Sequence, residues 1–326
     1  MTDPALQIDG VTVRAHPNIA LVKYWGKADT ERNLPATGSL SLTLGGLSTK
    51  TTVRCAQKDA FRLQHDSDPK ASQRLFRFLD VAFPDRPQLA VDTDNDFPTA
   101  AGLASSASGF AAVVMAVDTL LGTALPTHRL AQIAGAGSGS AARSLYGGIV
   151  RLDPPADRQS DITVTQICDA GAWPLEVIVA VIDEGPKTVG STEGMESTRA
   201  TSPYYPAWVS SHASDLDAAT KAVERRDFDA LATVTEHSYL KMHSVMMSAQ
   251  PPILYWLPPS LGVIRAIQAQ REAGYPVCCT MDAGPQVKVL TTADYAEQVQ
   301  ALVRDLPGVQ RTIRSGLGQG AMLLED

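Results

Sequence analysis

Residues 97–110 read FPTAAGLASSASGF, a stretch in which nearly every position after the Phe-Pro pair carries a small side chain or a hydroxyl group. The apolar run that overlaps its end, GFAAVVMAVDTLLG, predicts a mostly buried helix that ends at Gly122. Small residues let another molecule approach the backbone closely, and the first N–H groups of a helix favour an anion. The stretch therefore predicts a phosphate-binding loop that leads into a buried helix.

In this interpretation Gly102 and Ala104 leave room for a triphosphate, while the hydroxyl groups of Ser105 and Ser106 bind phosphate oxygens or a metal ion. A loop of small residues also forms where a turn must merely pack closely, so this alternative stays open. The pattern GxxxxGK[ST] is absent from the stretch, which argues against a Walker-type ATPase.

The composition is that of a globular chain with more than one core. Of the 326 residues, 44% are hydrophobic and 19% are charged, and this size favours two domains. A net charge of -7 argues against bulk binding of nucleic acid, which needs many Lys and Arg contacts to phosphates. There is no basic and apolar leader, no bilayer-length apolar run and no CxxC pair. We expect a cytoplasmic protein that binds neither membranes nor nucleic acid.

The first half of the chain begins with strand patterns and continues with helices. Apolar and polar residues alternate over 11–16 and 39–47, and β-branched residues are frequent over 49–55, which together predict an antiparallel sheet. Helices are predicted over 71–83 and, with Thr127 as N-cap, over the ten residues that follow it.

The second half combines strands and helices in the order of a split βαβ, ferredoxin-like unit. A strand at 174–183 and a polar loop at 183–195 precede helical stretches that include 212–246. A helix, a strand, a turn, a strand, a helix and a strand follow, over 260–274, 276–281, 282–285, 286–290, 294–306 and 309–314. We expect an N-terminal domain over residues 1–183 and a C-terminal domain over residues 184–326.

Two lysines lie four residues apart in the stretch HPNIALVKYWGKADTERNLPATGSLSL, which covers residues 16–42. Lys23 and Lys27 fit a solvated helical face, which is the ordinary interpretation of this spacing. The apolar neighbours of Lys23 favour a buried cation instead, and such a cation needs a carboxylate or phosphate partner.

Two further charged residues lie beside tight turns. Arg143 follows Ser138 and Ser140 in GSGSAARSLYGG, where it grips an anion with its bidentate fork or forms an ion pair on a helix surface. Asp282 follows the apolar strand in CCTMDAGPQVKVL, where it caps the turn or lies half-buried with its charge set by a nearby lysine. Both alternatives stay open for each residue.

Five stretches together resemble one protein family. NIALVKYWGK, NLPATGSLSLTL, FPTAAGLASSASGFAA, GSGSAARSLYGG and MDAGP occur in the order found in mevalonate diphosphate decarboxylases of the GHMP kinase superfamily, and they span residues 18–285. The resemblance implies an α+β, two-lobed fold with an N-terminal lobe like domain 2 of ribosomal protein S5 and a ferredoxin-like C-terminal lobe. It also implies that ATP and mevalonate 5-diphosphate give isopentenyl diphosphate, ADP, phosphate and carbon dioxide.

The same resemblance implies roles for single residues. Asp282 matches the catalytic aspartate near the 3-hydroxyl group, Lys23 matches the lysine beside that aspartate, and Arg143 matches the arginine that holds the substrate carboxylate. The implied contacts with substrate are Tyr24, Arg77, Ser138, Ser140, Ser191 and Thr192. Ser106 matches the serine at the ATP phosphates, next to Gly102, Ala104 and Ser105, which the loop itself predicts as phosphate contacts. Mg²⁺ is expected with the nucleotide, its protein ligands are not specified, and relatives are commonly homodimers.

The chain departs from the common family pattern in two places. TVGSTEGM has Gly190 where many relatives carry Ser and Thr192 where some bacterial enzymes carry Arg, and Gln286 and Val287 follow DAGP in place of Asn and Ala. A phosphomevalonate decarboxylase and a mevalonate 3-kinase are the alternative enzymes. A non-catalytic relative would lack a catalytic residue or the phosphate loop, and the sequence keeps both.

Overall fold

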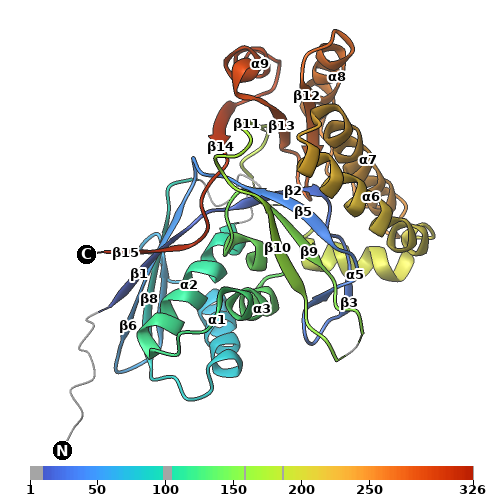
Figure 1. Ribbon diagram of the computed structural model, residues 1–326. Helices are drawn as coiled ribbons and strands as arrows, with labels where there is room; N and C mark the ends of the chain where they lie inside the picture. Colours follow the sequence, from blue (N-terminus) through green and yellow to red (C-terminus); the bar gives the residue numbers. More distant parts are fainter. Residues whose placement is uncertain (1–9, 98–104, 158, 186, 326) are drawn as a thin grey trace, which may run out of the picture.

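The fold is α+β with two lobes, and the computed structural model describes residues 10–97, 105–157, 159–185 and 187–325 (Figure 1). Gly102 and Ala104 lie outside the described residues. Within the described ranges, no helix has the length and apolar character that a membrane span requires.

The first lobe is built on a five-stranded sheet with the order β15-β1-β6-β8-β7. Its strands are β15 (Met322–Leu324), β1 (Val11–Ala15), β6 (Thr49–Cys55), β8 (Leu89–Asn95) and β7 (Ala60–Leu63). All neighbours are antiparallel except β7 and β8. The stretches 11–16 and 49–55 thus form strands of this antiparallel sheet as predicted, whereas the stretch 39–47 forms a strand of a second sheet.

Four helices cover this lobe, and Figure 1 shows the first three grouped beside the sheet. They are α1 (Pro69–Ala82), α2 (Ser105–Leu121), α3 (Thr127–Gly137) and α4 (Ala141–Ser144). The predicted apolar helix is confirmed as α2, and it ends where Gly122 adopts a φ of +65°. The predicted N-cap at Thr127 is wrong, because Pro126 takes the extended N-cap conformation and the helix starts at Thr127 itself.

A second sheet lies between the two lobes and has the order β10-β9-β5-β2. Its strands are β10 (Thr163–Cys168), β9 (Ile149–Asp153), β5 (Ser39–Thr43) and β2 (Asn18–Val22), and a small hairpin of β3 (Lys27–Asp29) and β4 (Leu34–Pro35) extends from it. Apolar side chains of β2 and β5 share one core with side chains of the second lobe, such as Val179 and Leu216. This shared core fixes β2, and therefore the residues that follow it, against both lobes.

The second lobe contains the predicted ferredoxin-like unit. Its antiparallel sheet has the order β12-β13-β11-β14, formed by β11 (Leu175–Val181), β12 (Val277–Met281), β13 (Val287–Thr292) and β14 (Arg311–Gly316). Its helices are α5 (Ser191–Thr201), α6 (Tyr205–Arg225), α7 (Phe228–Met247), α8 (Pro258–Glu272) and α9 (Ala296–Arg304), with a short 3-10 turn, η1 (Ala293–Tyr295), before the last of them. Every residue of β12 is buried, and β11 and β13 are each buried except at one residue.

The polar loop predicted over 183–195 is wrong at its end, because α5 begins at Ser191. Gly190 takes the N-cap position, and the carboxylate of Glu193 in the first turn complements the helix dipole. Polar residues at a helix start therefore resembled a loop in the sequence.

After β14 the chain returns to the first lobe. Leu317 forms a bridge with Leu44, and β15 pairs with β1 at the sheet edge (Figure 1). The crossing is close: a Cβ atom on Gly45 would lie 2.8 Å from the Cα atom of Gly318. The two lobes are therefore tied by backbone pairing beside the cleft described next.

Candidate active site

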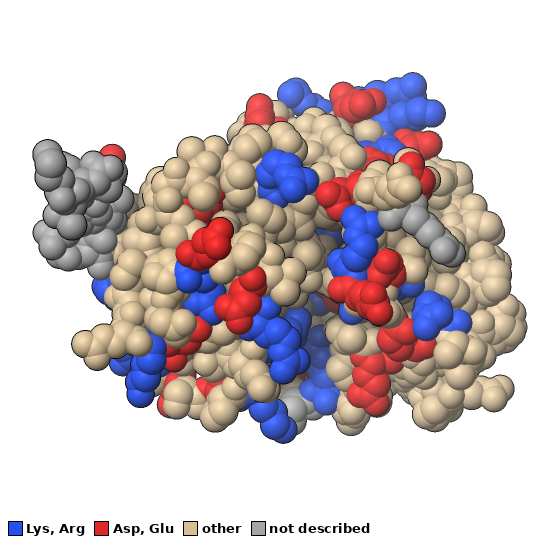
Figure 2. All heavy atoms as spheres, turned by 90° about the horizontal axis from the view of Figure 1, so that it is seen from below, with Lys and Arg blue, Asp and Glu red and all other residues tan. Residues whose placement is uncertain are grey.

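One large cleft of about 1280 Å³ runs between the lobes. Elements far apart in sequence meet in it: the end of β2, helix α1, the start of α2, the turn before α4, the start of α5 and the turn after β12. Its described lining contains seven cations, Lys23, Lys27, Lys70, Arg74, Arg77, Arg143 and Lys187, and three carboxylates, Glu31, Glu193 and Asp282. Figure 2 shows Lys and Arg gathered along the hollow on this face. The local field therefore favours an anion although the whole chain is acidic.

Asp282 lies directly after β12 and holds two buried lysines. Lys23 Nζ is 2.5 Å from its Oδ1 atom, and Lys288 Nζ is 3.0 Å from its Oδ2 atom. Burial alone would raise the pKa of this carboxyl group, but the two ammonium groups together hold its pKa well below the ordinary value. Asp282 is therefore an ionised carboxylate that still exposes 32% of its side chain to the cleft.

Lys23 is the cation that the apolar sequence around it predicted. It lies in the segment between β2 and β3 and is 1% exposed, so the solvated helical face is wrong for this residue. Its Nζ also donates a hydrogen bond to the carbonyl oxygen of Ala20 at 2.7 Å. Burial lowers the pKa of Lys23 to about 8, with Asp282 opposing that shift and Lys288 adding to it.

Arg143 on α4 is buried and has no carboxylate partner among the described residues. Its guanidinium donates to hydroxyl oxygens of Ser39 at 2.8 Å and Ser41 at 3.0 Å, and to Oδ1 of Asn18 at 3.2 and 3.3 Å. Burial lowers the pKa of Arg143 to about 10, so it keeps its charge at neutral pH. The ion pair on a helix surface is therefore wrong, and a buried positive charge faces the cleft with neutral partners only.

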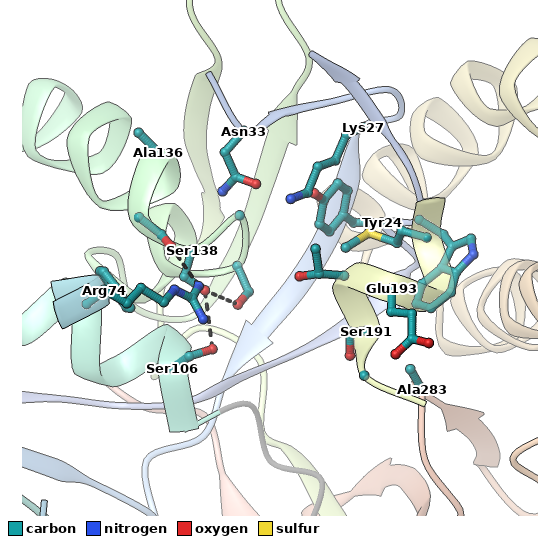
Figure 3. A pocket seen from close by; sticks show the side chains of 18 of the residues that line it. Tyr24, Lys27, Asn33, Arg74, Ser106, Ala136, Ser138, Ser191, Glu193 and Ala283 are labelled. Carbon is teal, nitrogen blue, oxygen red and sulfur yellow. Dashed lines mark hydrogen bonds between the residues drawn. The ribbon is translucent and has the colours of Figure 1, made fainter. Parts of the chain in front are cut away.

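A row of serine hydroxyls joins the start of α2 to the turn before α4. Ser106 Oγ lies 3.3 Å from Ser138 Oγ, which lies 3.5 Å from Ser140 Oγ (Figure 3). Ser105 is the first residue of α2 and lines the same cleft. The cleft therefore receives both hydroxyl groups and the N-terminal end of a long buried helix, which together suit phosphate oxygens.

The opposite wall carries Tyr24, Lys27 and Ser191, which face Arg74 and Ser138 across the cleft in Figure 3. The hydroxyl group of Tyr24 is buried without a hydrogen-bond partner in the described part of the chain, and burial raises its pKa to about 12. Thr192 lines the cleft next to Ser191. This wall thus offers a neutral phenol and two hydroxyl groups to a ligand.

Three cations of this region, Lys70, Arg74 and Lys288, were not predicted from the sequence. Arg77 was predicted and lines the cleft. Arg74 lies on the same helix and also lines the cleft, and its Nη2 donates a hydrogen bond to the carbonyl oxygen of Gly137 at 3.2 Å. Lys70 lies one turn before Arg74. The spacing of four and three residues between Lys70, Arg74 and Arg77 was the available signal, because it places all three on one face of a helix. The third is Lys288, whose signal in the sequence was a lysine between the two valines Val287 and Val289.

No three His, Cys, Asp or Glu side chains cluster as a metal site within the described residues. The groups that fit a nucleotide with its metal ion are the Ser105 and Ser106 hydroxyls together with the cleft cations, since these bind phosphate oxygens.

Comparisons with known proteins cover nearly the whole chain. Residues 15–163 match the family model of the diphosphomevalonate decarboxylase-like N-terminal domain, and residues 177–319 match that of the mevalonate 5-diphosphate decarboxylase C-terminal domain. The diphosphomevalonate decarboxylase of Aspergillus fumigatus is 35% identical over 91% of this chain and 80% of its own length.

Solved structures of similar proteins share the fold. The mevalonate diphosphate decarboxylase from Staphylococcus aureus aligns with a TM-score of 0.91 at 33% identity, over 97% of this chain and 98% of its own. A structure of MDDEF in complex with MVAPP, AMPPCP and magnesium aligns with a TM-score of 0.89 at 35% identity, over 97% of this chain and 99% of its own.

Proposed function

The chain belongs to the family of diphosphomevalonate decarboxylases, and from this premise we propose how its own residues carry out the reaction. The reaction uses ATP to phosphorylate the 3-hydroxyl group of mevalonate 5-diphosphate, and loss of phosphate and carbon dioxide then gives isopentenyl diphosphate. The observation that carries the assignment of roles is one cationic cleft in which an ionised Asp282 and an uncompensated, buried Arg143 both face the ligand space.

Asp282 and Lys23 act on the first step. The carboxylate of Asp282 accepts the hydrogen bond of the 3-hydroxyl group and orients its oxygen toward the phosphoryl group. It receives the proton only as the new O–P bond forms, because that bond makes the oxygen strongly acidic. Lys23, held 2.5 Å from Asp282, offsets the negative charge that develops on the transferred group.

Arg143 acts on the second step. When phosphate leaves C3, positive charge develops there, and the carboxylate of the substrate supplies the electrons as carbon dioxide departs. A guanidinium with only neutral partners binds that carboxylate strongly because no protein carboxylate competes for it. We infer that Arg143 fixes the carboxylate in the orientation for departure, and the cleft walls exclude water around the cation.

ATP lies with its phosphates at the N-terminal end of α2. Contacts with these phosphates are assigned to Gly102 and Ala104 on the sequence alone, and Ser105 and Ser106 bind phosphate oxygens or the magnesium ion. A relative binds AMPPCP and magnesium, and Mg²⁺ supplies charge neutralisation between the phosphates. The remaining contacts with the substrate are assigned to Tyr24, Arg77, Ser138, Ser140, Ser191 and Thr192.

Three wider features belong to the same proposal. We keep the expected boundary near residue 183, between an ATP-binding lobe (1–183) and a second lobe (184–326), with two exceptions. Strand β11 lies before the boundary but belongs to the sheet of the second lobe, and β15 lies after it but belongs to the sheet of the first. The enzyme works in the cytoplasm and as a homodimer, and the homodimer rests only on the family resemblance.

The value of kcat/KM is expected to fall as the pH rises through about 8. Lys23 must be protonated to offset phosphoryl charge, and its pKa of about 8 means that the cation is lost above that pH. Phosphate groups of both substrates are fully ionised there and do not titrate further. The measurement is kcat/KM from about pH 6.5 to about pH 9, since this constant reports the free enzyme and Arg143 stays charged over this range. A constant kcat/KM up to about pH 9 would contradict the role of Lys23, and Lys23→Arg, which does not titrate, is the matched control.

A coupled assay of ADP release and captured carbon dioxide tests the function. We expect equal amounts of both with mevalonate 5-diphosphate, and neither with mevalonate or its 5-phosphate. ADP without carbon dioxide would indicate a mevalonate 3-kinase, and preference for the monophosphate would indicate a phosphomevalonate decarboxylase. No turnover of any of the three compounds would indicate a non-catalytic relative.

A further inference from the structure

Lys288 is a buried lysine on a face of the sheet where its neighbours are apolar core residues. It is 1% exposed and is the second residue of β13, and its immediate neighbours along the strand, Val287 and Val289, belong to the core on the opposite face of the sheet. It shares its face with Leu290 and with Val179, its cross-strand neighbour on β11, and both belong to the core between the lobes. A buried ammonium loses its hydration, so packing of the sheet does not explain this residue.

The only ion pair found for Lys288 among the described residues is with Asp282, at 3.0 Å from its Nζ to Oδ2. Lys23 holds the other oxygen, and it comes from the segment after β2 in a different sheet. The terminal torsion of an aspartate is soft, so a carboxylate held by one oxygen rotates over a broad range. Two ammonium groups, one on each oxygen, remove that freedom.

Lys288 does not line the cleft, whereas Lys23 and Asp282 do. Its ammonium therefore lies behind the carboxylate and acts on a ligand only through it. The charged and titratable groups that act with it are Lys23, Asp282, Lys187 and His243. The two positive charges of Lys23 and Lys288 face the single negative charge of Asp282. The carboxylate therefore does not fully cancel the repulsion between the two ammonium groups.

We propose that Lys288 is a positioning residue, which fixes the second oxygen of the Asp282 carboxylate so that this group meets the substrate in a single orientation. This inference rests on the proposed role of Asp282.

The test is Lys288→Met, which keeps the length of the side chain and removes its charge. We expect kcat to fall about 10- to 100-fold, as for other small misalignments of a reacting group, with little change in KM. The melting temperature should stay level or rise, because an apolar side chain suits this core face and repulsion with Lys23 is relieved. The substitution should thus lower kcat without lowering the melting temperature. Loss of a purely structural residue would lower both.

The pH profile gives a second readout. Lys288 is one cause of the lowered pKa of Lys23, so its removal raises the pKa of Lys23. The high-pH limb of kcat/KM therefore shifts to higher pH in Lys288→Met. Leu290→Ala, on the same strand and face, is the matched control: it should lower the melting temperature and leave this limb in place.

The outcomes separate the two proposals. If Lys288→Met keeps the wild-type kcat and pH profile while Asp282→Asn is inactive, the inference about Lys288 is overturned and the role of Asp282 stands. The inference is also overturned if Lys288→Met behaves like Leu290→Ala, with a lower melting temperature and an unmoved limb. If Asp282→Asn retains kcat, the proposed role of Asp282 is wrong, and the inference about Lys288, which rests on that role, is wrong as well.

Discussion

Asp282→Asn is expected to stop the release of both ADP and carbon dioxide, with kcat about 10²- to 10⁴-fold lower, which is the usual contribution of a positioned proton acceptor. Asparagine keeps the shape of the side chain and one acceptor oxygen but neither the charge nor the ability to take up a proton. Because phosphorylation of the 3-hydroxyl group precedes decarboxylation, both products should fall in the same proportion. The measurement is single-turnover release of ADP and carbon dioxide at saturating substrates.

The substitution also removes the anion between Lys23 and Lys288, so a loss of folding must be separated from a loss of chemistry. The double variant Asp282→Asn with Lys288→Met removes one of the two repelling cations. We expect it to recover the melting temperature that Asp282→Asn loses, while activity stays absent. If the double variant regains activity, Asp282 serves only to neutralise the lysines, and its assignment to the 3-hydroxyl group is wrong.

Much of the fold could be predicted from the sequence because its signals are local. The alternating strand at 11–16, the apolar helix that ends at Gly122 and the order of elements after residue 174 each follow from periodicity and turn residues. What local patterns do not contain is the pairing of distant segments. Nothing in residues 317–324 indicates that the chain returns to the first lobe, because a short strand that adds to an existing sheet edge needs little pattern of its own.

The candidate site shows the same division. The apolar residues around Lys23 predicted a buried cation with an anionic partner. In the structure this partner is the carboxylate of Asp282, which forms an ion pair with Lys23. Burial of Arg143 was not predictable from its own stretch, since its neighbours Ser39 and Ser41 come from a strand about one hundred residues earlier. Lys288 was overlooked because a single lysine in a strand ordinarily indicates an exposed face, and only the register of β13 shows that this face is buried.

Arg143→Gln is expected to lower kcat/KM for mevalonate 5-diphosphate by about 10²- to 10³-fold, in the range measured when one partner of a buried charge pair is removed. Glutamine still offers hydrogen bonds to Ser39 and Ser41 but no longer holds a carboxylate through a charged fork. Since this contact acts on the departing carboxylate, carbon dioxide should fall more than ADP. The ratio of the two products, measured in one reaction mixture, therefore rises above one ADP per carbon dioxide.

Stability distinguishes this effect from damage to the fold. Arg143 is a buried charge with only neutral partners in the described residues, so its removal should leave the melting temperature level or raise it. Arg151 provides the matched control, since it is an arginine on β9 whose partners Asp153 and Asp217 are carboxylates outside the cleft. Arg151→Gln should lose some stability and keep the product ratio. A ratio of one in Arg143→Gln, with ADP and carbon dioxide reduced equally, would place Arg143 at the binding or phosphorylation step rather than at carboxylate departure.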